Sequence, residues 1–134
     1  MRSFFPGLFI LLAVVFSSCS KEDENQYVTP SLITLKTSIP LGAPGTASLS
    51  FDEVVSDSRC PANSLCSWAG IAIAKFIFTE GKESYPFMLS VMPGFPKQDT
   101  MIRGYHIEFS DLKPYPGLIS DKATIQAEVR ITKL

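Results

Sequence analysis

Two cysteines and the chain's only tryptophan lie within residues 57–70 (DSRCPANSLCSWAG). Thiols can form a structural disulfide, act as a redox pair or bind a metal. A redox pair favours close spacing at a helix start, where the thiolate is stabilised, whereas five residues separate Cys60 from Cys66 and the flanking sequence is strand-like. Zinc requires three or four ligands, and this segment offers two. These residues favour a structural disulfide, with redox work and zinc binding as alternatives.

Other side chains with chemical potential are scattered along the chain. His106 is the only histidine, and Glu108 shares its strand face, an arrangement that can serve proton transfer. Soft ligands that would suit copper are Met88, Met92 and Met101, together with His106. Solvent-facing polar pairs and methionines that fill a core are much commoner, and we find no nucleophile elbow or phosphate-binding glycine loop. We therefore expect no catalytic site, no metal and no cofactor.

The N-terminus predicts export. One basic residue, Arg2, precedes an apolar run over residues 4–16, and two serines lie directly before Cys19. This pattern is a secretory signal, which we exclude from the fold, and it is shorter than the roughly 20 apolar residues of a transmembrane helix. Its end resembles the lipobox of bacterial lipoproteins, in which the cysteine is diacylated and becomes the mature N-terminus.

The lipobox resemblance implies a signal peptide at residues 1–18, a lipid anchor with palmitate on Cys19, and a flexible acidic tether over residues 19–26. Acyl chains contribute about 0.8 kcal/mol per buried methylene, so several together hold a protein on a membrane. An acidic stretch after the lipidated cysteine also resembles a surface-display signal of some Gram-negative lineages. We expect an outer-membrane lipoprotein of the cell envelope, either displayed on the cell surface or held on the periplasmic face.

Export also bears on the remaining thiols. With Cys19 acylated, two cysteines are left in an oxidising compartment, so we expect Cys60 and Cys66 to form one local disulfide. Closing such a short loop contributes about 2.4 kcal/mol if disulfides act through chain entropy.

The charge balance argues against a nucleic-acid partner. The 134 residues include 12 basic and 13 acidic ones, and loss of residues 1–18 removes Arg2, which leaves a net charge near −2 without a basic cluster. Nucleic-acid binding requires a positive footprint. The 116 residues that remain after removal of 18 from 134 suffice for one domain. We place it at residues 27–134 and expect a monomer.

The mature sequence alternates between apolar and polar residues. The clearest strand covers residues 124–134, and further runs cover residues 32–39, 48–52, 71–78, 85–92 and 105–110. Turns rich in proline and glycine separate them. This pattern predicts an all-β fold: an antiparallel β-sandwich of about seven strands, immunoglobulin-like or a related Greek key. The passage 107–114, followed by the strand from Thr124, resembles the crossover between sheets in immunoglobulin-like sandwiches.

The cysteine segment resembles a motif, D-S-R-C-P-x4-C-x-W-A-G, of small exported bacterial lipoproteins of uncharacterised function. Here it comprises Asp57, Ser58, Arg59, Cys60, Pro61, Cys66, Trp68, Ala69 and Gly70. The resemblance supports the fold and the location and names no activity. We expect Trp68 to shield the disulfide and Arg59 or Asp57 to secure the loop, with Pro61 and Gly70 as further motif residues.

Two aromatic residues on proline-stiffened loops are candidate binding residues, Phe95 and Tyr115. A rigid aromatic side chain is a low-entropy anchor for a partner, although each could instead fold back over the core. We therefore expect a non-catalytic binding or accessory module for a protein or glycan partner. The alternatives are an inhibitor-like module that inserts a loop into an enzyme, and an envelope thiol–disulfide redox protein.

Overall fold

The computed structural model describes residues 27–43, 45–94, 96–118 and 124–134. Cys19, the predicted signal peptide and tether, and Phe95 lie outside the described residues. The described part contains eight strands and no helix: β1 (Tyr27–Thr34), β2 (Ser38–Leu41), β3 (Ala47–Asp57), β4 (Ala72–Glu80), β5 (Glu83–Ser90), β6 (Asp99–Ile102), β7 (Tyr105–Lys113) and β8 (Gln126–Lys133). The all-β prediction is confirmed, with eight strands where about seven were expected.

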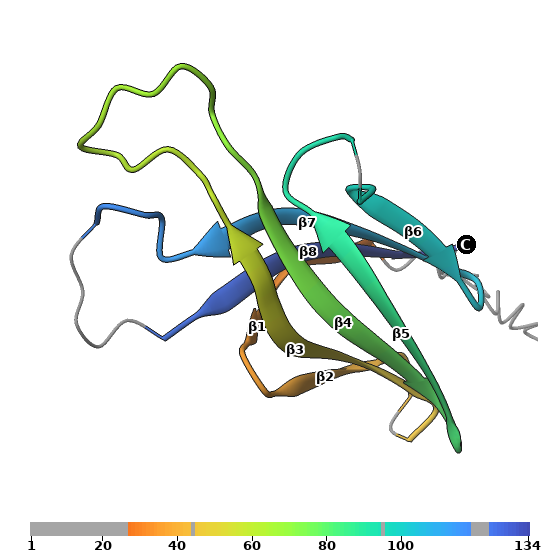
Figure 1. The fold of residues 1–134 in the computed structure, drawn as a ribbon. Coiled ribbons are helices and arrows are strands. Elements are labelled where there is room, and N and C mark those ends of the chain that lie inside the picture. The colour runs from red at the N-terminus through yellow and green to blue at the C-terminus, as the bar shows by residue number, and fades with distance from the viewer. Residues whose placement is uncertain (1–26, 44, 95, 119–123) are drawn as a thin grey trace, which may run out of the picture.

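The strands form two antiparallel sheets that pack face to face (Figure 1). One sheet has the order β1-β8-β7-β6 and the other has the order β2-β3-β4-β5, so the chain changes sheet between β1 and β2 and again between β5 and β6. The antiparallel sandwich is thereby confirmed. The expected crossover after residue 114 is wrong, because β7 and β8 are neighbours in one sheet and their apolar residues pair directly, Ile107 with Ile131 and Phe109 with Val129.

Two local features differ from the sequence pattern. The run 32–39 is broken by a turn in which Lys36 has a positive φ of 65° and the Thr37 backbone N–H donates to the Thr34 carbonyl at 3.0 Å. It therefore supplies the end of β1 and the start of β2. β6 was not expected, and it joins β7 through Arg103 and Gly104, whose φ values of 48° and 78° suit a two-residue hairpin turn.

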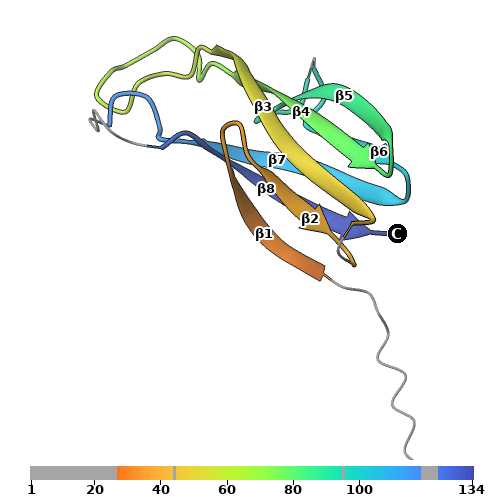
Figure 2. The ribbon, with the colours of Figure 1, turned by 90° about the horizontal axis from the view of Figure 1, so that it is seen from below.

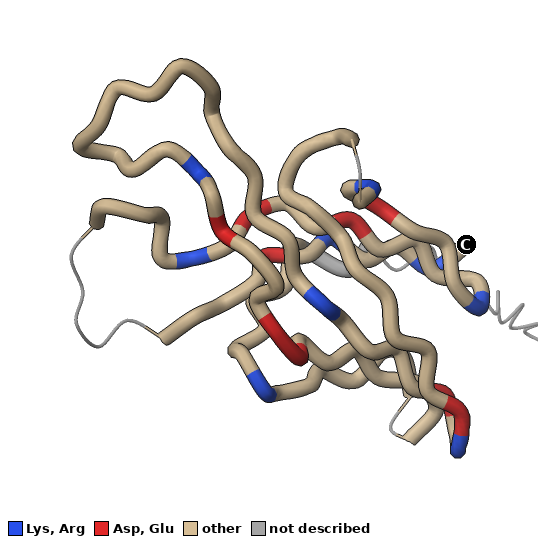
Figure 3. Tube along the Cα trace, in the orientation of Figure 1, with Lys and Arg blue, Asp and Glu red and all other residues tan. Residues whose placement is uncertain are grey.

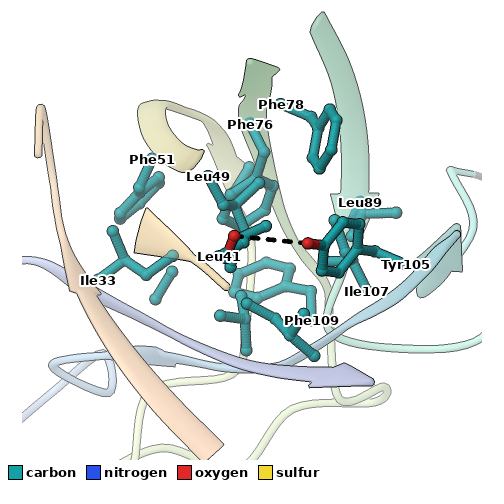
Figure 4. Close-up of a cluster of buried hydrophobic side chains, with 14 of the residues drawn as sticks. Ile33, Leu41, Leu49, Phe51, Phe76, Phe78, Leu89, Tyr105, Ile107 and Phe109 are labelled. Atoms are coloured by element: carbon teal, nitrogen blue, oxygen red, sulfur yellow. Dashed lines mark hydrogen bonds between the residues drawn. The ribbon is translucent and has the colours of Figure 1, made fainter. Parts of the chain in front are cut away.

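The core lies between the two sheets and is rich in phenylalanine. Phe76 on β4 lies at its centre, with ring centroids 5.5 Å from Phe51 on β3 and 5.3 Å from Phe109 on the facing sheet (Figure 4). All three side chains are fully buried. Close-packed aromatic pairs of this kind stabilise the fold beyond the contribution of buried apolar surface. The pair of Phe76 and Phe109 also holds the two sheets together.

The two ends of the sandwich carry different parts of the chain (Figure 2). The long β3–β4 connection and the segment after β7 lie at one end. The start of β1 lies at the other end, because Tyr27 pairs with Thr132 near the end of β8. Whatever precedes residue 27 therefore joins the domain at the end opposite the β3–β4 connection. Within the described residues, no helix is long and apolar enough to cross a membrane.

Candidate functional site

The β3–β4 connection, residues 58–71, is a disulfide loop. Cys60 and Cys66 are bonded, with their Cα atoms 5.9 Å apart, so the predicted local disulfide is confirmed. The base of the loop continues the pairing of the two strands: the Ser58 N–H donates to the Ile71 carbonyl at 2.9 Å, and the Cys60 N–H donates to the Ala69 carbonyl at 2.8 Å. The loop is thus closed twice, by backbone hydrogen bonds and by the sulfur bridge.

Arg59 fastens this base to the other sheet. Its side chain is only 4% exposed, and its guanidinium donates to both carboxylate oxygens of Asp57, at 2.9 and 2.8 Å. The same group reaches β7, where it donates to the Leu112 carbonyl at 2.7 Å and to Asp111 Oδ1 at 3.2 Å. Asp57 ends β3, so one side chain joins the two sheets at this end of the sandwich. A buried guanidinium is tolerated when its donors are satisfied in this way.

The pKa of the Asp57 carboxyl reflects two opposing causes. Burial raises the pKa, and the hydrogen bonds and charge of Arg59 lower it by more, so the net result is a pKa below the ordinary value of 3.8. A carboxyl with a lowered pKa contributes stability that is fully present above its unfolded pKa and is lost as the pH falls through its folded pKa.

The Asp57→Asn variant should therefore be less stable than the wild type at pH 7, and the difference should narrow below about pH 4. Urea unfolding of both proteins from pH 7 down to pH 2 measures this difference. Glu53→Gln on the same strand is the control, since Glu53 makes no ion pair among the described residues. A gap between wild type and Asp57→Asn that stays constant with pH would show that the ion pair with Arg59 is not formed.

The disulfide loop packs closely on residues 114–118, which we call the proline segment. The Ala62 N–H donates to the Pro116 carbonyl at 2.9 Å. Gly117 has a φ of 82°, and a Cβ there would lie 2.9 Å from Asn63 Oδ1 and 3.0 Å from the Pro61 Cβ. Glycine is therefore required at this contact, where two segments far apart in the sequence touch backbone to backbone.

Tyr115 stands on the proline segment with its ring over Arg59. The guanidinium carbon lies 4.8 Å from the ring centroid, a cation–π distance, and the side chain is 37% exposed. Tyr115 is therefore not a core residue. Arg59 contacts one face of its ring, and the rest of the side chain is partly exposed to solvent. Phe95, the other candidate anchor, belongs to the part of the chain that the structure does not describe.

Trp68 differs from its expected role. Its side chain is 65% exposed and Cys66 is exposed as well, so the prediction that the indole shields the disulfide is wrong. The physical reason is that the loop extends beyond the end of the sandwich and has no second layer to bury a large side chain. Leu65, at the tip of the loop, is fully exposed.

These residues line one shallow hollow of about 560 Å³, together with the disulfide. We call Leu65, Trp68 and Tyr115 the loop face. Exposed aromatic side chains on a rigid support are enriched among binding hot spots. The structure thus brings Tyr115 to the cysteine segment, 49 residues beyond Cys66, and turns Trp68 toward solvent.

The structure gives the other candidate residues different neighbours from those considered in the sequence. His106 Nε2 lies 2.8 Å from Asp99 Oδ2 on β6, while Glu108 forms an ion pair with Arg130 at 2.9 Å, so the considered pairing of His106 with Glu108 does not occur. The methionines considered as copper ligands are divided between the sheets, Met88 on β5 and Met101 on β6. No group of three or more His, Cys, Asp or Glu residues in the described part is placed to hold a metal ion.

Compared with known proteins, the chain matches no family model, no curated protein and no solved structure. The functional interpretation therefore depends on the geometry and chemistry of the loop face.

Proposed function

We propose that the protein is a non-catalytic binding or accessory module of the cell envelope, which holds a protein or glycan partner through the loop face. The observation that carries this proposal is the joint exposure of Leu65, Trp68 and Tyr115 around one hollow. The disulfide and the buried Arg59 fix the supporting segments before a partner arrives. Binding then costs little ordering entropy, which favours affinity.

The proposed location is the outer membrane, with residues 1–18 removed as a signal peptide and Cys19 acylated. A disulfide suits such an oxidising compartment. The seven residues from 20 to 26 would span at most about 25 Å, and they join the domain at the end opposite the disulfide loop. At about 3.3 Å per residue, the 11 residues of β3 separate the two ends by roughly 35 Å. A tether from Cys19 would therefore be too short for the loop face to turn end-on toward the membrane.

The same loop face would serve an inhibitor-like module. In that case the partner would be an enzyme, and its activity would fall on binding. A fall in the partner's enzymatic activity on binding would distinguish this alternative from simple attachment.

Site-specific crosslinking in the producing cells tests the proposed binding surface. A photoreactive benzoyl-phenylalanine in place of Leu65 should form a discrete adduct on irradiation, whereas the same residue in place of the exposed Met101 on β6 should not. Adding Trp68→Ala should weaken the affinity, and with it the adduct formed below saturation, by about thirtyfold or more, because truncation of a hot-spot aromatic typically costs 2 kcal/mol or more. Absence of an adduct from position 65, or equal adducts from both positions, would refute a binding role for the loop face.

A further inference from the structure

The loop face carries no charge. Neither residues 60–70 nor the proline segment contains Asp, Glu, Lys, Arg or His, and in Figure 3 the tube of the β3–β4 connection is tan along most of its length. Arg59 itself is buried, and its donors are engaged by Asp57, Asp111 and Leu112. Among the residues that the structure describes around the hollow, a partner that carries phosphate, sulfate or carboxylate groups would find no counter-charge. Charge complementarity therefore favours a neutral partner.

The side chains around the hollow suit a ring with both apolar and polar parts. Trp68 and Tyr115 supply aromatic surface, and Ser64 and Ser67 supply hydroxyl groups beside them. A pyranose ring presents C–H groups on its faces and hydroxyl groups at its edge. The C–H groups pack on aromatic rings, and the hydroxyl groups exchange hydrogen bonds with neutral donors and acceptors such as serine.

The size of the hollow is sufficient for a saccharide. Its volume of about 560 Å³ is within the range of small-ligand sites, roughly 300–1,000 Å³. A stable protein interface would instead bury about 800 Å² of surface and 20–30 residues on each partner, with a polar rim around the buried centre. Ten residues line this hollow, which is enough to contact a short saccharide.

We propose that the loop face binds a neutral glycan, with sugar rings packed against Trp68 and Tyr115 and their hydroxyl groups bonded to the serines of the disulfide loop. This inference rests on the proposed binding function and specifies its ligand class.

Intrinsic fluorescence reports directly on the site, because Trp68 is the only tryptophan in the chain. The mature protein is titrated with neutral polysaccharides (dextran, mannan, β-glucan, galactan and the neutral glycan fraction of the producing cells' envelope) and with dextran sulfate and polygalacturonate. We expect at least one neutral glycan to shift or quench the emission saturably, with no such effect from the charged polymers. The proposal would be overturned if no neutral glycan changed the Trp68 emission, or if the charged polymers changed it equally.

Affinity electrophoresis in gels containing the responding glycan tests the residues. Trp68→Ala and Tyr115→Ala should each weaken retention by about tenfold or more, Trp68→Phe should keep part of it, and the control Met101→Ala should match the wild type. Thermal melting of each variant separates lost binding from lost folding. A polypeptide adduct at position 65 that depends on Trp68, without glycan binding, would refute the saccharide and leave the binding function intact. Absence of any adduct would refute both.

Discussion

Replacing Gly70 with alanine is expected to destabilise the protein by about 3 kcal/mol or more. Gly70 is buried with a φ of 74°, a conformation that costs other residues roughly 1–2 kcal/mol. A Cβ would also lie 1.9 Å from the Ser58 carbonyl oxygen. Ser58 cannot retreat easily, because its N–H is bonded to the Ile71 carbonyl at the base of the loop. The variant must distort the point at which the loop joins β3 and β4.

Gly81→Ala is the matched control for this prediction. Gly81 also has a positive φ, 60°, but nothing lies within 4 Å of a Cβ built there. Its substitution should therefore cost only the backbone strain, about 1–2 kcal/mol. Chemical denaturation of both variants gives the difference in their free energies of unfolding. Equal losses would mean that the contact between Gly70 and Ser58 relaxes freely, and that the loop base is not rigid.

Several strands could be predicted because their alternation is visible in the sequence. β7 and β8 place Ile107, Phe109, Val129 and Ile131 on one face, and burial on one side of a sheet imposes that period. The choice of sheet partner is not encoded in the same way. Two strands with one apolar face each can pair edge to edge or pack face to face, so the pairing of β7 with β8 could not be read from the alternation.

Turn chemistry explains the errors in element boundaries. Lys36 adopts a positive φ, where glycine or asparagine is the usual signal, so the break between β1 and β2 is hidden in the sequence. β6 has four residues, too few to establish a period. Its hairpin partner lies just beyond Arg103 and Gly104, a pair that is not among the common turn signals.

The candidate site was only partly predictable for a related reason. The disulfide follows from the number of cysteines, whereas the exposure of Trp68 depends on whether another layer covers the loop. The contact of Tyr115 with Arg59 joins residues that are 56 positions apart, and neither residue signals it. One local signal was present: residues 60–70 contain leucine and tryptophan without a single charge. A charge-free apolar loop between two strands is a feature of binding surfaces as well as of cores.

Arg59→Met is expected to cost about 2–3 kcal/mol, because hydrogen bonds to charged groups contribute roughly 1.5–3 kcal/mol and the carboxylates of Asp57 and Asp111 that remain are partly exposed to solvent, at 24% and 40%. Methionine keeps much of the apolar length of arginine, so the loss comes from polar groups left without their donor: the Asp57 carboxylate and the Leu112 carbonyl. Arg59→Lys should also lose most of this stability, because an ammonium group cannot match the planar fork that spans both sheets. Urea denaturation of the mature protein measures each loss.

Arg103→Met separates this role from that of an ordinary surface arginine. Arg103 forms ion pairs with Glu80 and Glu83 but its side chain is 47% exposed, so we expect a loss of no more than about 1 kcal/mol. Arg59 also supports the ring of Tyr115, and its removal should therefore weaken glycan retention in proportion to the loosening of the proline segment. If Arg59→Met and Arg103→Met lowered the free energy of unfolding by the same small amount, the Arg59 guanidinium would not be what holds the two sheets together at this end. The rigidity of the loop face would then have to come from the disulfide alone.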